Sequence, residues 1–408
     1  MAGKNTGKRE ALRRWAAALA LFFTLLAVCP FALAEVAPEA GALTEDAAPE
    51  IDTEAEPAED IDVPEDIEAE AQSDADAEEN SGSVLLTVTA AGDCTFAGEV
   101  GSKSYKRFNE CVQQYGYDYF LENVRDLFES DDLTIVNLEG PLTTSEKPKK
   151  HGYVFKADPD CVNILTGSSV ELCNLANNHS LDYGTAGLKE TAETLAANGV
   201  GYCGFTEVYN ATIKGVRVTA LGFTKWDNTA EEVYRMVSEA RENCDLLIVN
   251  MHWGWERQHQ QCEAQVDMGH LAVDAGADLV IGTHPHVYQG IEKYKGRYIV
   301  YSLGNFCFAG NANPEDKRCL IFQQTFSFNP GMGIVQANFM DAGINIIPAS
   351  ISSASDKNDF KPTVMPAQEG AALLKAVAGV SSHFSWADSL WMKDNYLVAN
   401  GLVKGEEE

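Results

Sequence analysis

The sequence predicts an α/β domain, and three features support that fold class. Short apolar runs rich in β-branched residues recur along the chain, separated by segments with the 3.6-residue period of helices. Of the 408 residues, 45% are hydrophobic and 9% aromatic, which is typical of a globular protein. No break in composition divides residues 84–382. We therefore expect one large domain over that range.

Six apolar runs predict buried strands. A helix is clearest over 184–199, where Leu188, Ala192 and Leu195 share one face and Gly199 provides a stop. The later segment 326–351 predicts antiparallel strands joined by turns. The six predicted strands are Val84–Ala90, Leu133–Glu139, Val170–Ala176, Asp245–Trp253, Asp278–His286 and Arg297–Phe306.

The first 34 residues have the order of an export signal. A basic segment, KNTGKREALRR, precedes the apolar run WAAALALFFTLLAVCPF, and the small residues ALA end at Ala34. The apolar run is at the short limit for spanning a bilayer, so residues 1–34 are either a cleaved signal peptide or an N-terminal membrane anchor. Both alternatives predict an extracytoplasmic protein, secreted or anchored at the cell surface.

The net charge of −31 is concentrated in one segment. Residues 35–83 contain nineteen Asp or Glu and no Lys or Arg. Such a segment buries too little apolar surface to fold, so we expect an acidic disordered linker there, and a C-terminal tail over 383–408. The remainder of the chain is still acidic, which argues against nucleic acid as a partner.

Nine cysteines follow the export segment, an odd number without a CxxC pair. Most of them, such as Cys173 and Cys307, lie inside apolar runs. We therefore expect buried free thiols rather than a disulfide framework.

Polar side chains recur where predicted strands end. Because the carboxyl ends of strands in an open α/β sheet border a common crevice, we expect these side chains to meet there. Carboxylate, amide and imidazole groups without a thiolate suit Mn, Fe or Zn, and a glutamate able to bridge two ions suits a two-metal centre. The strand-end residues are Asp93, Glu139, Asn178, His179, His252, His284 and His286.

Taken singly, these residues have ordinary explanations. A histidine beside tryptophan, such as His252, is more often a core or surface residue, and NNH or HPH can form turns. Five such sets at five strand ends favour a shared site. Asp182 either holds the His179 ring in one orientation or caps a helix. Lys156 either meets an anion or is solvated, and His270 fits an ordinary helix face.

Six segments together resemble a known family. They are GDCTFAG, NLEGPLT, NLANNHSLDYG, HWGWE, GADLVIGTHPHVYQGIE and YSLGNFCF, in this order. They are similar to the CapA family, poly-γ-glutamate capsule biosynthesis proteins related to calcineurin-like metallophosphoesterases. The resemblance covers roughly residues 84–328 and continues more loosely to about 382. It implies a four-layer α/β/β/α sandwich with a metal site at its edge, on an exported or membrane-anchored protein.

The resemblance also implies a role for each strand-end residue. Asp93 and His286 resemble ligands of one metal, and Glu139 stands where a bridging acid is expected. Asn178, His252 and His284 resemble ligands of the second metal. His179 resembles the acid or orienting histidine beside the leaving group, with Asp182 beside it.

Two positions depart from the superfamily pattern. Thr95 stands where a histidine is usual, and the bridging residue is Glu139 rather than aspartate. These departures weaken the expectation of a complete first metal position. The sequence therefore predicts a site for either one or two divalent ions.

Two function classes follow. The first is a metal-dependent, phosphoesterase-like hydrolase that acts on a phosphoester or on an amide of a glutamate polymer. The second is a non-catalytic accessory or scaffold protein for export or anchoring of an anionic surface polymer. Capsule-synthesis membrane proteins are candidate partners in both cases, and an uncleaved N-terminus would add contact with the membrane.

Overall fold

The computed structural model describes residues 83–328 and 339–381, which belong to one compact unit. The predicted export segment, nearly all of the predicted acidic linker and the predicted C-terminal tail lie outside the described residues. So do the expected turns within 329–338. None of the helices in the described ranges has the length and apolar character needed to cross a bilayer.

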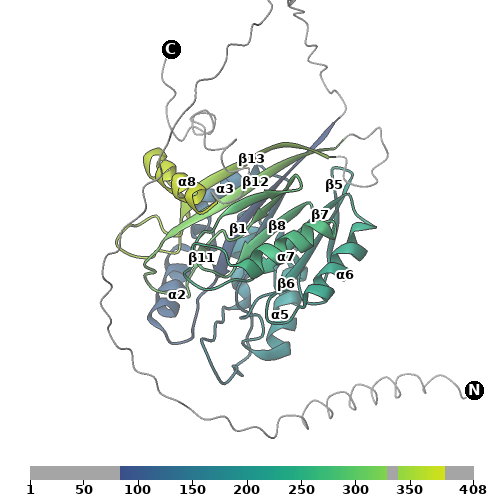
Figure 1. Ribbon diagram of the computed structural model, residues 1–408. Helices are drawn as coiled ribbons and strands as arrows, with labels where there is room; N and C mark the ends of the chain where they lie inside the picture. The colour runs from purple at the N-terminus through teal and green to yellow at the C-terminus, as the bar shows by residue number, and fades with distance from the viewer. Residues whose placement is uncertain (1–82, 329–338, 382–408) are drawn as a thin grey trace, which may run out of the picture. The chain divides into compact units, whose positions relative to one another are not determined.

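The first sheet combines a parallel part with an antiparallel part (Figure 1). Strands β1, β2, β3 and β4 run parallel to one another, whereas β12, β13 and β14 extend the sheet on the other side of β1 by antiparallel pairing. A short strand, β11, pairs in parallel with the end of β1. The bounds in sheet order are β14 (Thr363–Val364), β13 (Phe339–Ser350), β12 (Arg318–Phe328), β1 (Val84–Thr95), β2 (Leu133–Leu138), β3 (Leu172–Asn174) and β4 (Gly201–Cys203), with β11 (Asn305–Phe308) beside β1.

The second sheet has a parallel centre and two antiparallel edges. Strands β6, β7, β8 and β10 are parallel, and β5 and β9 pair antiparallel at the edges. The bounds in sheet order are β5 (Tyr209–Ile213), β6 (Val216–Thr224), β7 (Leu246–His252), β8 (Leu279–Thr283), β10 (Arg297–Val300) and β9 (Ile291–Tyr294).

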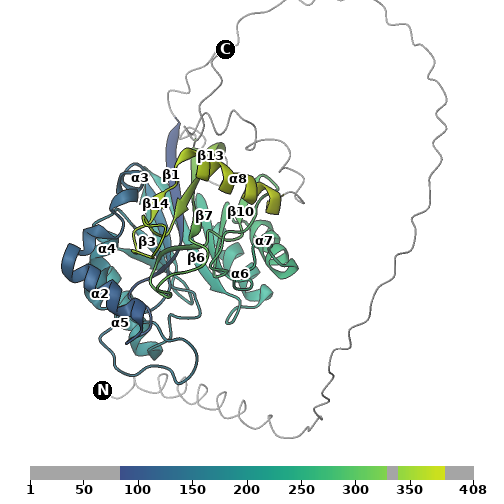
Figure 2. The same ribbon diagram turned by 90° about the vertical axis from the view of Figure 1, so that its left-hand side faces the viewer.

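Helices cover the outer faces of both sheets (Figure 2). Four pack on the first sheet: α2 (Lys103–Tyr115), α3 (Arg125–Glu129), α4 (Val162–Thr166) and α5 (Gly184–Ala197). On the second sheet lie α6 (Ala230–Arg241) and α7 (Glu263–Asp274). Helix α8 (Ala367–Ser381) contributes Leu373, Leu374 and Val377 to the core between the sheets. Short 3₁₀ turns occupy Tyr117–Tyr119, Glu122–Val124 and Pro159–Cys161.

Strand periodicity explains why the layers form. Alternate side chains of a strand point to opposite faces, and in β7 Leu246 and Ile248 enter the core between the sheets, whereas Leu247 and Val249 enter the core under α6 and α7. β2 divides its side chains between the inter-sheet core and the core under α2–α5 in the same way. Because both faces are buried, these strands are mainly apolar, and their polar exceptions, such as Asn137 in β2 and His252 in β7, are buried as well. The predicted α/β/β/α sandwich is confirmed.

Several predicted element bounds were wrong. The run Arg297–Phe306 forms two strands in different sheets, because the chain leaves the second sheet after Val300 and pairs with β1 from Asn305 onward. Gly304, with φ +80°, allows that change of direction. The run Val170–Ala176 keeps only three strand residues, whereas the clearest predicted helix appears as α5.

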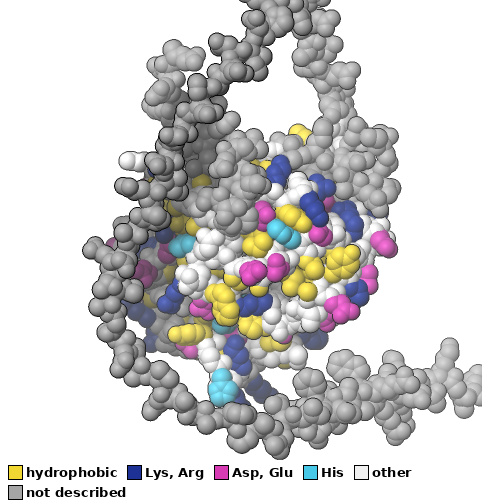
Figure 3. All heavy atoms as spheres, viewed as in Figure 1, with side chains coloured by type: hydrophobic (Ala, Val, Ile, Leu, Met, Phe, Trp, Pro, Cys, Tyr) yellow, Lys and Arg dark blue, Asp and Glu magenta, His cyan; other side chains and the backbone are white. Residues whose placement is uncertain are grey.

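The cysteines and His270 are arranged as the sequence predicts. All nine cysteines beyond the predicted export segment are free, and seven are buried. His270 lies on α7, where its Nε2 atom is 2.9 Å from Glu292 Oε1. On the face shown in Figure 3, Lys and Arg side chains are interspersed with Asp, Glu and apolar side chains. The acidic excess of the chain therefore does not form one continuous patch on that face.

Candidate metal centre

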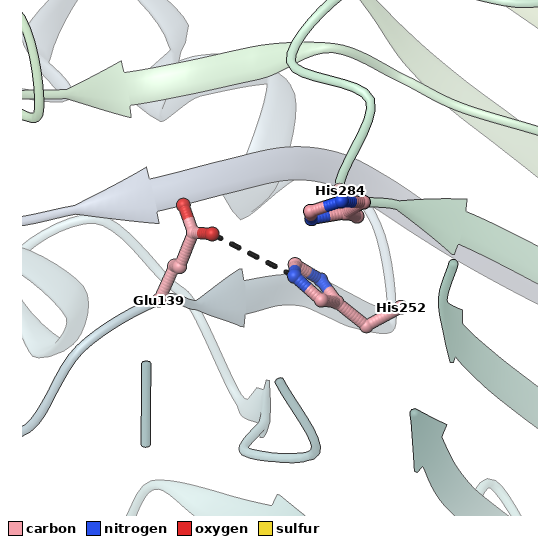
Figure 4. Close-up of side chains that lie close together, drawn as sticks. All are labelled: Glu139, His252 and His284. Atoms are coloured by element: carbon pink, nitrogen blue, oxygen red, sulfur yellow. Dashed lines mark ion pairs between the residues drawn. The ribbon is translucent and has the colours of Figure 1, made fainter. Parts of the chain in front are cut away.

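The strand-end side chains converge from both sheets. Glu139 follows β2 of the first sheet, and His252 ends β7 of the second. His284 lies just after β8, and Figure 4 shows its ring beside that of His252, with Glu139 facing both. Asp93 lies inside β1, past an irregularity in the pairing with β2, rather than after the strand as predicted. The site therefore joins the carboxyl edges of the two sheets.

Glu139 belongs to two groups of potential metal ligands. One consists of Glu139, His252 and His284, and the other of Asp93, Glu139 and His286. The Oε1 atom of Glu139 lies 3.6 Å from His252 Nε2 and 3.8 Å from His286 Nε2. Ligand atoms about 2.0–2.2 Å from one ion lie roughly 3–4 Å from each other, so these spacings suit metal coordination. The geometry therefore provides two adjacent positions with one shared carboxylate.

Asn178 extends the group around His252. Its Oδ1 atom is 2.7 Å from His252 Nε2, so this amide oxygen faces the same position as the imidazole. The other nitrogen of His252, Nδ1, lies 3.0 Å from Thr283 Oγ1. With Nδ1 engaged there, Nε2 is the nitrogen directed at Asn178 and Glu139.

Two buried polar atoms of the site lack hydrogen-bond partners among the described residues. They are Glu139 Oε1 and His284 Nδ1. A buried carboxylate oxygen or imidazole nitrogen without a partner is costly in free energy, and a cation removes that cost. The donor set therefore fits a divalent ion, with oxygen and nitrogen ligands and no thiolate.

The pKa directions agree with a site built for positive charge. Burial, followed by the neighbouring His284 and His286, holds the pKa of His252 well below its usual range. Burial and then His286 lower the pKa of His284 to about 2, so both rings are neutral and able to coordinate. Burial alone would lower the pKa of His286, but the Glu139 and Asp93 carboxylates outweigh it and raise that pKa to about 10.

The loop after β8 holds its two histidines in an uncommon backbone conformation. His284 has φ 97° and His286 has φ 59°, and non-glycine residues rarely adopt positive φ. His286 Nδ1 is 2.9 Å from Asn305 Oδ1, and the amide of Asn305 donates to the His286 carbonyl oxygen at 3.1 Å. β11 therefore supports the turn that directs His286 toward Asp93.

His179 and Asp182 form a pair beside the two metal positions. His179 Nδ1 lies 2.8 Å from Asp182 Oδ2, and Asp182 is fully buried. The imidazole stacks on Phe155, with the ring centroids 4.1 Å apart. Residue Tyr183, not Asp182, precedes α5, and it makes no side-chain cap, so Asp182 orients the histidine rather than capping that helix. This geometry leaves Nε2 of His179 to exchange a proton.

A cavity of about 300 Å³ opens beside His252. Its lining includes Met251, Trp253, Met268 and the exposed Lys225. The Lys225 ammonium lies 4.5 Å and 4.4 Å from the ring centroids of Trp226 and Trp255, respectively. His252 is the member of the candidate ligand groups that lines this cavity.

The range that holds these residues also matches a known protein family. Residues 87–310, more than half of the chain, match the family described as bacterial capsule synthesis protein PGA_cap. The chain belongs to the PGA_cap family. That range includes every predicted site residue, from Asp93 to His286.

Curated relatives of this PGA_cap chain carry related descriptions. Capsule biosynthesis protein CapA of Bacillus anthracis is 29% identical over 304 residues, which cover 67% of this chain and 71% of that protein. PGA biosynthesis protein CapA of Bacillus subtilis (strain 168) is 32% identical over 246 residues, 54% of this chain and 65% of the relative. Among solved structures, a 5'-nucleotidase from Candida albicans aligns over 66% of this chain and 52% of that protein, with 15% identity and a TM-score of 0.39, a likeness too weak to support an argument.

Sequence reasoning missed polar residues that support the PGA_cap site. Asn137 donates to Asp93 Oδ1 at 2.7 Å, and Thr95 donates to Glu139 Oε2 at 2.9 Å. Asn305 holds His286, as described above. Each lies within a motif quoted for the family, and Asn137 is two residues before Glu139, so the same strand-end criterion applied to amides could have found it. The assigned metal and catalytic roles themselves stay predictions.

Proposed function

We propose that this protein is an extracytoplasmic, divalent-metal-dependent hydrolase that acts in poly-γ-glutamate capsule synthesis. The observation that carries the proposal is the position of Glu139, shared between two groups of ligand-type side chains. A shared carboxylate between two adjacent cation positions is the arrangement used in two-metal hydrolysis. The family and its relatives support the biological setting, and the predicted export segment supports the extracytoplasmic location.

Each side chain of the site has a distinct part in the proposed reaction. Asn178, His252 and His284 would hold one ion, Asp93 and His286 would hold the other, and Glu139 would contact both. A divalent ion such as Mn, Fe or Zn, when bound, supplies Lewis acidity and lowers the pKa of a water molecule. His179 Nε2 would then donate a proton to the leaving group, and Asp182 would hold the ring in the required orientation. The cavity beside His252 would accept part of the substrate.

The proposed substrate is a phosphoester or a γ-glutamyl amide of an anionic polymer. Hydrolysis of either bond adds water at phosphorus or at an amide carbon, and in both reactions the leaving atom needs a proton, which His179 would supply. His179 is 8% exposed, so it is shielded from bulk water yet reachable from the site. The same acid could therefore serve either bond.

The test is a metal titration of hydrolysis. Wild type and His179→Ala are assayed with phosphate esters and with a γ-linked glutamate oligomer while Mn is increased. We expect slow turnover by wild type and a loss of at least about 100-fold in His179→Ala, because general acid catalysis typically contributes 10² to 10⁴. His259→Ala, on a histidine outside the site, is the control and should keep the wild-type rate.

Metal content must be measured in the same samples, since His179→Ala should retain its metal. No turnover of either substrate by folded, metal-loaded wild type would reject the hydrolase proposal. One observation favours the alternative accessory role in that case. The Thr95 hydroxyl donates a hydrogen bond to Glu139 Oε2. In the metallophosphoesterases that the chain resembles, this position usually holds a histidine ligand of the first metal. A single ion would then have a structural role in a protein that binds the polymer.

A further inference from the structure

A basic segment lies beside the candidate metal centre. We define the basic loop as residues 144–156, between β2 and α4. It contains four lysines, one histidine and a single carboxylate, Glu146, which precedes Lys147. In a chain with a net charge of −31, this local concentration of positive charge runs against the overall composition.

Both ends of the basic loop are fixed to the domain. Glu190 of α5 accepts hydrogen bonds from the Thr144 backbone N–H at 3.0 Å and from its hydroxyl at 2.8 Å. At the other end, the backbone N–H of Lys156 donates to the Gly98 carbonyl oxygen at 3.0 Å, and its ammonium donates to the Ser145 carbonyl oxygen at 2.7 Å. Lys156 is therefore engaged within the loop rather than simply solvated.

The loop also contacts the His179–Asp182 pair directly. Lys149 forms an ion pair with Asp182 Oδ1, and its backbone N–H donates to the Asp182 carbonyl oxygen at 2.7 Å. The Lys149 ammonium also lies 3.4 Å from the backbone oxygen of Asn178. Phe155, which stacks on His179, donates its N–H to Asp182 Oδ2 at 2.6 Å. The basic loop therefore forms one wall of the site.

Two lysines of the loop do not contribute to this attachment. Lys147 and Lys150 are exposed, and neither forms an ion pair within residues 83–328 and 339–381. They flank Lys149, which is held at the site. Their charges are therefore available to an anionic ligand, and they lie two residues and one residue from Lys149, which contacts the His179–Asp182 pair.

We propose that the basic loop is a binding subsite for a carboxylate-rich polymer, with Lys147 and Lys150 as its specificity-determining residues. This inference rests on the proposed function, since it names how an anionic substrate overcomes the acidic charge of the protein. The exposed ammonium groups attract the polymer, and Lys149 and Phe155 fix the loop so that the bound strand passes His179. The attraction is screened by salt, because both lysines are exposed.

Binding can be measured without turnover. A fluorescent γ-linked glutamate oligomer is titrated with the full chain, in chelator and in excess Mn, and anisotropy is recorded. Lys147→Gln/Lys150→Gln is compared with wild type. The control, Lys295→Gln/Lys375→Gln, removes the same charge from the β9–β10 turn, at the edge of the second sheet opposite the metal centre, and from the exposed face of α8.

We expect the double loop variant to bind about tenfold more weakly at low salt, and the control to bind within about twofold of wild type. The difference between wild type and the loop variant should largely disappear at about 0.5 M salt, where the screening length is only a few ångströms. Thermal unfolding of wild type and the loop variant should coincide, since exposed lysines without ion pairs contribute little stability. The control loses the exposed ion pair between Lys295 and Asp274, which lie 2.6 Å apart, and such surface pairs also contribute little.

Three outcomes would overturn the inference. Equal weakening by the loop and control variants would show that only net charge matters. Unchanged binding in the loop variant would place the polymer elsewhere. Binding of a polyphosphate, but not of the glutamate oligomer, through Lys147 and Lys150 would assign the loop to a phosphate polymer. Because the assay needs no hydrolysis, the two proposals can fail separately. A protein that binds the oligomer through Lys147 and Lys150 but does not hydrolyse it would contradict the hydrolase proposal and support the binding subsite.

Discussion

Glu139 and Asn137 show how much of the site depends on individual hydrogen bonds. Glu139 is fully buried, and burial raises its pKa, yet Thr95 satisfies only one of its oxygens. Asn137 supports Asp93 with its amide N–H, while its own Oδ1 accepts from Asn174 at 2.9 Å and Asn177 at 3.3 Å. Removing such a residue leaves several buried groups without partners, each at a cost of roughly 1–3 kcal/mol.

Asn137→Ala should therefore lower the free energy of unfolding by about 2–4 kcal/mol, and it should also weaken metal binding because Asp93 loses its support. Urea denaturation of the metal-free protein measures the first effect. Asn198→Ala is the matched control, because Asn198 is exposed and its side-chain amide donates to the Thr194 carbonyl oxygen of the adjacent helix α5. Its stability should change by no more than about 0.5 kcal/mol. Equal stability of the two variants would show that the Asn137 network has no structural importance.

At the scale of elements, β1 and β11 must approach closely to shape the site. A Cβ on Gly92 would overlap the carbonyl oxygen of Gly304, whose backbone accepts the N–H of Asp93 at 3.0 Å. The residue before Asp93 therefore has to be glycine. β11 follows directly and presents Asn305 to His286. The position of both Asp93 and His286 depends on this contact.

Gly92→Ala is expected to lower the free energy of unfolding by at least about 2 kcal/mol, because the backbone around it cannot move aside without loss of strand pairing. Gly379→Ala on α8 is a suitable comparison, since a Cβ there meets nothing within 4 Å. That variant should be unchanged or up to about 1 kcal/mol more stable, as alanine favours helix. Thermal or urea unfolding measures the stability of the two variants. An unchanged free energy of unfolding in Gly92→Ala would contradict the close approach of β1 to Gly304.

The sequence predicted elements whose apolar residues recur at regular intervals, and it predicted polar side chains at strand ends. It predicted α5, most strands of the parallel parts and the acid and imidazole groups that converge, but it missed the supporting amides of Asn137 and Asn305. It failed at Arg297–Phe306, because an apolar run does not reveal that its two halves pair in different sheets. The basic loop was also missed, apart from Lys156, because its importance depends on contacts with His179 and Asp182 that no spacing encodes.

At the scale of the whole molecule, the candidate metal centre joins two sheets whose shared core is mainly apolar. Asp93 and Glu139 come from the first sheet, and His252, His284 and His286 come from the second or from the loop after it. Ions bound here would connect the two halves of the sandwich. The pattern of shared ligands also makes the two positions separable by substitution, because His284 belongs to one group, His286 to the other and Glu139 to both.

The most direct test of this centre is the metal content of four proteins, wild type, His284→Ala, His286→Ala and Glu139→Ala, each loaded with Mn, desalted and analysed for metal per chain. Circular dichroism confirms that each is folded. We predict that wild type binds up to about two ions, that each histidine variant loses one position and keeps the other, and that Glu139→Ala loses both. Full metal content in Glu139→Ala, or in both histidine variants, would contradict the shared metal centre.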